Sequence, residues 1–398
     1  MSDSLGARIA ALRVRRRLTQ QQLADQAGIS VDVIRKLEQG QRATARLDTI
    51  TGLSHALDVP VSELLGKPRG LAPGLAENGE MMALRKAVLG LADPVSGPPS
   101  ADLLRTRTGE LWSLYWAGRY AELARALPGM IDNTRAAALA APTVSREGAY
   151  GALAELLQLA AALLTHLAHE DLAHVALMGA ATAAETASDE LLYGSQQATR
   201  TWLLIRQGLY SEAERLAVTA AEQLEPRLSQ ATPDRLAVWG ELLRYAVTAA
   251  ARSRGREVET QEMLGLAEAA AAAMQGNRPM RYSGLSFGPT IMAMKRVDVA
   301  MADDRPDRAL VLAGRVERMA EVPVAIQARY LLNVANAQCS TWESQAAVDT
   351  LRRVRDMAPE MIRHQGLARA VTQELLPRRR TQRLPGLTGL ASHLGIAV

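Results

Sequence analysis

The sequence has little of what builds disulfides or sheets. Among its 398 residues there is one cysteine, Cys339, so no internal disulfide bond can form. Aromatic residues make up 4% of the chain, with a single phenylalanine, and runs of β-branched residues with strand-like alternation are nearly absent. Alanine and leucine dominate instead, which is a helix-forming composition. We therefore predict an all-α protein.

Long apolar runs and a targeting leader are also missing. The most apolar stretch begins at Leu153 and is interrupted by Glu155, Gln158 and His166, which argues against a membrane span of about 20 apolar residues. No charged segment followed by an apolar one occurs at the N-terminus. Together with the lone thiol, this indicates a cytoplasmic protein without a membrane partner.

Positive charge gathers at the start of the chain. The net charge of +4 is too small for the whole protein to coat nucleic acid, so the distribution of charge matters more than its total. The first twenty residues contain one acidic residue, Asp3, and five arginines: Arg8, Arg13, Arg15, Arg16 and Arg17.

Residues 21–40 have the pattern of two short helices with a turn between them. Thr19 and Ser30 each precede an apolar-periodic run and can cap a helix through their side-chain oxygens, and Gly28 supplies the turn. The apolar positions recur at helical spacing: Leu23, Ala24, Ala27, Ile29, Ile34 and Leu37. Each helix therefore has one apolar face and one polar face, and the polar face suits a DNA groove.

Five helices are expected in an N-terminal domain over residues 1–66. Besides the two above, these are a helix over residues 4–16, one over residues 47–57, and a short one after Pro60 that is capped by Ser62 and ended by Gly66. Residues 67–80 are rich in glycine and proline and are predicted to be a linker.

Residues 81–398 are predicted to be helical hairpins. Short breaks that resemble one another interrupt the helical pattern at Trp116, Ile205, Arg252 and Ala302, and looser copies occur near Ala168 and Ser340. Their spacing of roughly 40 to 50 residues is wider than an ideal tetratricopeptide unit but fits helix pairs with lengthened helices. Such pairs stack into an α-solenoid with a concave face.

Residues 5–66 resemble the phage-repressor and Cro type of helix-turn-helix domain, a lambda-repressor-like fold. The resemblance is carried by "LTQQQLADQAGIS", by "IRKLEQGQR" and by the leucine pattern that follows. It implies that residues 31–39 form the recognition helix in the major groove of double-stranded DNA. It also implies that Val31, Asp32 and Lys36 contact bases, with Arg35 beside them, and that Gln20 contacts phosphate.

The chemistry of these side chains is compatible with base recognition. Lys36 or Arg35 can donate to guanine and Asp32 can accept from cytosine, so a G·C-containing operator is favoured. The residues predicted to contact DNA are Gln20, Ser30, Val31, Asp32, Arg35, Lys36, Arg42, Arg13 and Arg17. An ordinary solvated helix face remains the alternative for Arg35 and Lys36. Glu38 is expected to accept hydrogen bonds inside the domain.

The whole layout is similar to helix-turn-helix regulators with tetratricopeptide-like C-terminal domains, as in actinobacterial and peptide-responsive Gram-positive regulators. Aligning the breaks on that pattern predicts residues that face the concavity and bind a small molecule or peptide. The predicted ligand-binding residues are Trp112, Tyr115, Trp116, Gln158, Trp202, Arg206, Tyr245, Arg329, Asn333 and Asn336, and His166 is expected to face the concavity with them. Arg206 or Arg329 can hold a carboxylate with two hydrogen bonds. For the aromatic residues, packing in the core between repeats is the alternative.

No constellation for catalysis or metal binding stands out. His169 and His174 are five residues apart, unlike a zinc pair at i and i+4, and Cys339 lacks an evident base. We therefore expect no enzymatic activity, no metal and no cofactor. The expected function is sequence-specific transcription regulation by a homodimer that senses an effector. The alternative is an adaptor whose repeats bind a protein partner.

Overall fold

A computed structural model of the chain describes most of its residues. The described residues are 5–16, 18–40, 45, 47–57, 59, 64, 79–91, 101–228, 230–253, 255–274, 276–279, 282–283 and 286–396. Of the predicted fifth helix after Pro60 only Leu64 belongs to them, and most of the predicted linker, residues 67–80, lies outside them.

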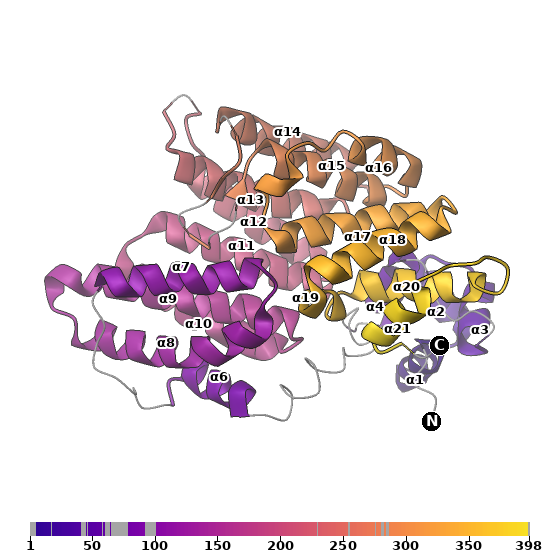
Figure 1. The fold of residues 1–398 in the computed structure, drawn as a ribbon, viewed down its shortest axis with the longest axis horizontal. Coiled ribbons are helices and arrows are strands. Elements are labelled where there is room, and N and C mark those ends of the chain that lie inside the picture. The colour runs from indigo at the N-terminus through magenta and orange to yellow at the C-terminus, as the bar shows by residue number, and fades with distance from the viewer. Residues whose placement is uncertain are drawn as a thin grey trace. The chain divides into compact units, whose positions relative to one another are not determined.

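The described N-terminal residues form four helices. They are α1 (Leu5–Arg15), α2 (Gln20–Ala27), α3 (Val31–Glu38) and α4 (Leu47–Leu57) (Figure 1). The fully buried side chains at their centre include Ile9, Leu23, Ile34 and Leu53. These come from all four helices, so each helix contributes an apolar face to one small core, as the spacing predicts.

The remaining elements are helical apart from one minute hairpin. The helices are α6 (Gly79–Leu89), α7 (Ala101–Trp116), α8 (Tyr120–Ala140), α9 (Thr143–His166), α10 (Glu170–Ala187), α11 (Glu190–Gln207), α12 (Tyr210–Leu224), α13 (Pro233–Ala250), α14 (Glu257–Ala273), α15 (Pro289–Ala302), α16 (Pro306–Ala313), the 3₁₀ helix η1 (Met319–Glu321), α17 (Val324–Ser340), α18 (Ser344–Met357), α19 (Pro359–Arg363), α20 (Gly366–Arg378) and α21 (Leu387–His393). Strands β1 (Arg278–Pro279) and β2 (Ser286–Phe287) pair antiparallel. The all-α class is confirmed.

The contacts divide the chain into two compact units. Unit 1 comprises Met1–Arg69, Arg206–Gly208 and Leu331–Val398, and unit 2 comprises Gly70–Ile205 and Leu209–Tyr330. This division groups the last residues of the chain with the first ones. The domain ranges 1–66, 67–80 and 81–398 stay a prediction.

One backbone turn recurs at all six predicted breaks. At each break a residue with a left-handed backbone follows the end of one helix and precedes the start of the next. These residues are Gly118, Ala168, Gly208, Gly255, Asp304 and Trp342, with φ between 53° and 82°. In five of the six, the next amide donates to the carbonyl five residues back, as His169 does to Leu164 at 2.9 Å. The turn ends one helix and reverses the chain, and its amides donate hydrogen bonds to the last carbonyls of that helix. The predicted positions of the breaks are confirmed.

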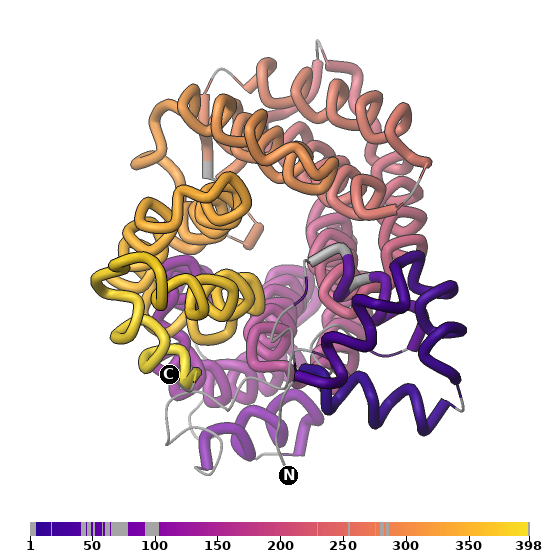
Figure 2. The backbone as a smooth tube through the Cα atoms, turned by 90° about the vertical axis from the view of Figure 1, so that its right-hand side faces the viewer, coloured from indigo at the N-terminus to yellow at the C-terminus, as the bar shows by residue number. Residues whose placement is uncertain are grey.

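In unit 2, successive helices run back and forth, and α9 packs most extensively against α10 (Figure 2). Helix α9 is long and apolar enough to cross a membrane, but 72% of its most apolar window is buried among its neighbours. This is the pattern of a core helix in a helical protein.

Replacing Ala168 by glycine is expected to stabilise the protein. A left-handed conformation costs an L-residue about 1–2 kcal/mol, and glycine avoids this cost. Part of the gain is offset because glycine loses about 0.5–1 kcal/mol more conformational entropy on folding than alanine. We expect Ala168→Gly to raise the free energy of unfolding by about 1 kcal/mol or less, measured by urea denaturation. The control Ala269→Gly, at an exposed position inside α14, is expected to lower it by about 1 kcal/mol. A loss of stability in Ala168→Gly contradicts the turn assignment.

Candidate functional site

The predicted capping residues begin both helices of the α2–α3 pair. The Thr19 side chain accepts from the Gln22 amide at 3.1 Å, and the Gln22 side chain accepts in return from the Thr19 amide at 2.9 Å. Gly28 ends α2 with φ 66°, and the Ser30 hydroxyl accepts from the Asp32 amide at 3.2 Å. These local bonds fix where α3 starts and therefore which of its residues are exposed.

Two glycines let the helices of this domain approach closely. A Cβ on Gly6 of α1 would lie 1.8 Å from the Leu37 carbonyl oxygen of α3. A Cβ on Gly52 of α4 would lie 2.6 Å from the Ala27 carbonyl oxygen of α2. Both contacts are with backbone, which cannot move aside as a side chain can. Helix α1 thus packs closely against α3, and α4 packs closely against α2.

Glu38 joins three elements of the domain. Arg13 donates to it through Nε at 2.7 Å and through Nη2 at 2.9 Å, and Gln20 donates through Nε2 at 2.7 Å. Arg13 also donates to the Leu18 carbonyl at 2.9 Å. Burial by itself raises the pKa of Glu38, but the hydrogen bonds from Arg13 and Gln20 and the charge of Arg13 outweigh it and lower the pKa. The internal role expected of Glu38 is confirmed.

The same network gives Arg13 and Gln20 an internal role. The Arg13 side chain is 16% exposed, and its guanidinium is engaged by Glu38 and by a backbone carbonyl. Phosphate contact by these two residues stays a prediction. The sequence predicts the internal role of Glu38 but not its partners, because Arg13 and Gln20 lie 25 and 18 residues away and each resembles an ordinary surface residue.

Helix α3 buries one side and exposes the other. Ile34 and Leu37 are buried in the core, while the side chains of Asp32, Arg35 and Lys36 are about half exposed. The Lys36 ammonium lies 2.7 Å from the Asp32 carboxylate, and this hydrogen bond lowers the pKa of Asp32. The exposed side therefore offers two cations and one anion that already has a donor.

The other residues predicted to contact DNA are placed as follows. Val31 is partly buried and packs against the core of the domain, and Ser30 is exposed at the start of α3. Arg17 and Arg42 lie outside the described residues. DNA contact by all of these residues stays a prediction.

In unit 2, five of the predicted ligand-binding aromatic residues line one cavity. Trp112, Tyr115 and Trp116 come from α7, Trp202 from α11 and Tyr245 from α13. We call this cavity the aromatic chamber. The Trp112 and Trp116 rings are stacked with centroids 6.3 Å apart, and Tyr115 meets the Trp116 ring edge-on at 4.8 Å. The free volume of the chamber is about 30 Å³, room for about two water molecules.

Arg329 lies against two walls of the aromatic chamber. Its Cζ atom is 5.3 Å from the centre of the Trp202 ring and 6.0 Å from that of Trp116, within the range of cation–π attraction. Its Nη2 atom lies 3.0 Å from Nε2 of His166. Burial lowers the pKa of Arg329, but the hydroxyl groups of Tyr115, Tyr120 and Tyr245 outweigh it, so the guanidinium keeps its charge.

Gln158 is bonded to the wall of the aromatic chamber without lining it, whereas Trp112 is a lining residue. The Gln158 amide nitrogen donates to the carbonyl of Ser195 at 3.1 Å and to the Thr199 hydroxyl at 2.9 Å, two residues of the chamber wall. Its Oε1 atom and the Trp112 Nε1 atom are buried without a hydrogen-bond partner.

The three other predicted ligand-binding residues belong to unit 1. They are Arg206, Asn333 and Asn336. Their assignment to ligand binding stays a prediction.

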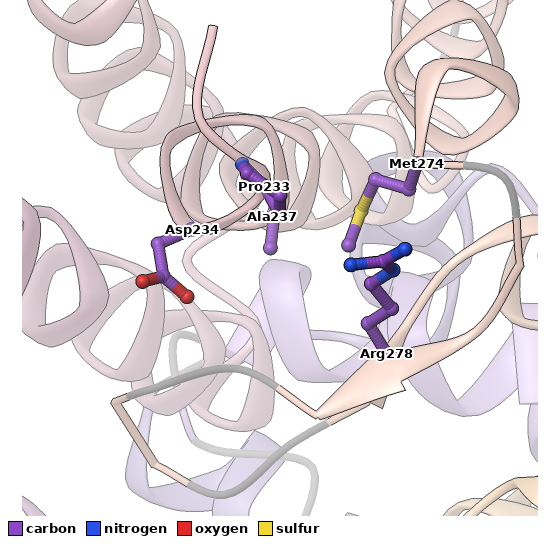
Figure 3. A pocket seen from close by; sticks show the side chains of 5 residues that line it. All are labelled: Pro233, Asp234, Ala237, Met274 and Arg278. Carbon is purple, nitrogen blue, oxygen red and sulfur yellow. The ribbon is translucent and has the colours of Figure 1, made fainter.

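A second hollow in unit 2 is larger but poorer in polar groups. It measures about 410 Å³ and is lined by Pro233, Asp234, Ala237, Met274 and Arg278 (Figure 3). Met274 and Arg278 lie close together, while Asp234 points away from them. A specific ligand site needs a few convergent polar groups, and the aromatic chamber meets this requirement better.

Comparison with known proteins defines the N-terminal part of the chain. Residues 4–65 match a family described as a helix-turn-helix domain. Over 65 residues the chain is 38% identical to the HTH-type transcriptional repressor RghR of Bacillus subtilis (strain 168); the alignment covers 16% of this chain and 48% of that protein. The chain thus spans about half the length of this relative. No solved structure matches the chain.

These comparisons agree with the geometry of helices α1 to α4. The chain carries a helix-turn-helix domain at its N-terminal end, and it is similar there to a protein named as a transcriptional repressor. The matched residues end at residue 65, so the comparisons leave the helical hairpins unassigned.

Neutralising Glu38 is expected to destabilise the helix-turn-helix domain. Glu38→Gln removes the charge that holds Arg13 and Gln20, and a hydrogen bond to a charged group contributes about 1.5–3 kcal/mol. The pKa of Glu38 is lower in the folded protein than its ordinary value of 4.5. Its contribution is therefore present above pH 4.5 and is lost as the pH falls through the folded pKa.

The measurement is urea denaturation followed by circular dichroism between neutral pH and pH 3. Asp25→Asn is the control, because Asp25 accepts only from Gln21 of its own exposed helix surface, and a change within about 0.5 kcal/mol is expected. Equal losses in the two variants contradict the assigned role of Glu38.

Proposed function

We propose that the protein is a sequence-specific DNA-binding transcription regulator. The observation that carries the proposal is helix α3: within a matched helix-turn-helix segment, it buries Ile34 and Leu37 and exposes Asp32, Arg35 and Lys36. Its exposed side would enter the major groove, where Lys36 or Arg35 donates to guanine and Asp32 accepts from cytosine. The proposal places the protein in the cytoplasm and includes no enzymatic step and no cofactor.

We further propose that the protein acts as a homodimer on a two-fold symmetric operator. One recognition helix reads only a few base pairs, and a symmetric pair of half-sites supplies the rest. The six recurring turns support a helical-repeat region of tetratricopeptide type, which would provide dimerisation. Sedimentation of the intact protein at micromolar concentration is expected to give twice the mass of 42.8 kDa. A monomer bound to a full operator contradicts this part of the proposal.

The aromatic chamber is the proposed effector site. A ligand that enters it must separate rings carried by α7, α11 and α13, because little free space is left between them. Binding would favour an arrangement of these helices in which the chamber is wider. Such a difference in affinity between two arrangements is what any effector needs in order to change DNA binding.

The experiment is a selection of genomic DNA fragments with the intact protein, repeated with Lys36→Ala and at two salt concentrations. We expect a two-fold symmetric site whose base preference relaxes in the variant, with a loss of affinity of about 5- to 150-fold, or about 1–3 kcal/mol. Lys86→Ala is the matched control, because Lys86 is an exposed lysine of α6. Absence of enrichment at either salt concentration contradicts the proposal.

A further inference from the structure

Positive charge is concentrated in unit 1. Over its three segments, unit 1 has 21 lysine and arginine residues against 12 aspartate and glutamate residues, a formal charge of +9. Unit 2 has 25 against 30, a formal charge of −5. The modest total of +4 is therefore the sum of two parts of opposite sign. Unit 1 attracts the phosphates of nucleic acid, whereas unit 2 is repelled by them.

The C-terminal helices bring more than half of this charge to the unit that contains the helix-turn-helix domain. Residues 344–398, which include α18 to α21, contain nine arginines and four acidic residues. Burial lowers the pKa of Arg369 in α20, and the positive charge of Arg8 in α1 lowers it further. Such an influence acts only over a short distance, so α20 lies near α1. DNA held by the helix-turn-helix domain therefore has these helices close by.

Four exposed arginines gather where α20 turns into α21. We call them the C-terminal arginine cluster: Arg352, Arg379, Arg380 and Arg383. Arg379 donates through Nη1 to the Thr388 hydroxyl of α21 at 3.2 Å. A Cβ on Gly386 would lie 2.7 Å from Cδ of Arg352, so the side chain of Arg352, from α18, lies against the same turn.

Carboxylates do not balance the charges of this cluster. Arg352 has one acidic neighbour, Asp349, at 3.5 Å, and both side chains are exposed. For Arg380 and Arg383, the residues that the structure describes offer neither a carboxylate oxygen within 4.0 Å nor a side-chain hydrogen bond. Exposed guanidinium groups with free N–H donors bind phosphate with two hydrogen bonds and supply many of the phosphate contacts of DNA-binding proteins.

The turn suits a nucleic acid better than a protein partner. A protein interface needs apolar side chains at its centre. Residues 379–386, all of them described, expose no large apolar side chain, and Leu384 is buried. Apart from Pro385 and Gly386, their exposed residues are the arginines, Thr381 and Gln382, whose side chains can all donate to phosphate oxygens.

We propose that the C-terminal arginine cluster contacts the phosphate backbone of the DNA that the helix-turn-helix domain binds. These contacts add affinity without reading bases, because phosphates carry no sequence information. The inference rests on the proposed DNA-binding function and adds to it a second contact surface from the other end of the chain.

The test is the salt dependence of DNA binding by the intact protein. Fluorescence anisotropy measures the affinity for the selected operator and for an unrelated duplex of equal length. Each phosphate contact contributes about 0.9 to the slope of log Kd against log salt concentration. We expect Arg380→Gln combined with Arg383→Gln to lower this slope by about 1.8 on both duplexes. Base preference is expected to stay unchanged, in contrast to Lys36→Ala.

Two control pairs separate contact from overall charge. Arg215→Gln with Arg308→Gln removes the same charge from exposed positions of α12 and α16 in unit 2, and the slope is expected to stay unchanged. Replacing Arg380 and Arg383 by lysine keeps the charge and is expected to keep most of the slope. Thermal unfolding checks that each variant folds. The side chains of Arg380 and Arg383 are exposed, so the midpoint is expected to stay unchanged.

Three results overturn the proposal. The first is a slope that falls by less than about 0.9, the share of one contact, or that falls equally in the unit 2 control. The second is a fall confined to the operator, because phosphates are common to both duplexes. The third is an equal fall in the lysine and glutamine pairs, because attraction to phosphate depends on charge.

The outcomes also separate this inference from the proposed function. An unchanged slope, with lost regulation of a reporter gene in the glutamine pair, assigns the cluster to an acidic protein partner and removes the DNA contact. In that case binding by the helix-turn-helix domain is kept. If the wild-type protein binds neither duplex, the DNA-binding regulator itself is wrong.

Discussion

Chain reversal after each long helix is the constraint on which the rest of the helical region depends. The helices that precede the six turns have 14 to 24 residues, and the next helix begins after two or three residues at five turns and after six residues between α13 and α14. The left-handed residue in each connection makes this reversal possible. Three of the six positions have glycine, which adopts this conformation freely, while Ala168, Asp304 and Trp342 adopt it against their own preference. Packing of the paired helices therefore outweighs local backbone preference at these three turns.

Several features of the fold follow from the sequence because they are local. Thr19, Gly28 and Ser30 act on backbone groups no more than three or four residues away, so their positions predict the ends of α2 and the start of α3. The six breaks are visible for the same reason. The tetratricopeptide assignment of the repeats remains a proposal, since it concerns how hairpins stack rather than where they turn.

The partners of charged side chains do not follow from the sequence in the same way. Arg13 lies in a run of arginines and looks like a phosphate ligand, but folding brings it to Glu38. The aromatic residues could be assigned to one face of their helices, yet only the packing of α7, α11 and α13 shows that five of them enclose a single cavity. Whether Arg329 has an acidic partner also depends on residues far apart in the chain.

The pair formed by Asp32 and Lys36 has a consequence for how an operator is distinguished from other DNA. Any phosphate or base that takes Lys36 must compete with a carboxylate 2.7 Å away, and it leaves that carboxylate facing a negatively charged duplex. Random sequence offers Asp32 no compensation, whereas a cytosine amino group at the right position does. On the proposed interface, Asp32 thus increases selectivity mainly by weakening the binding of other sequences. It lowers the affinity for most DNA more than it raises the affinity for one site.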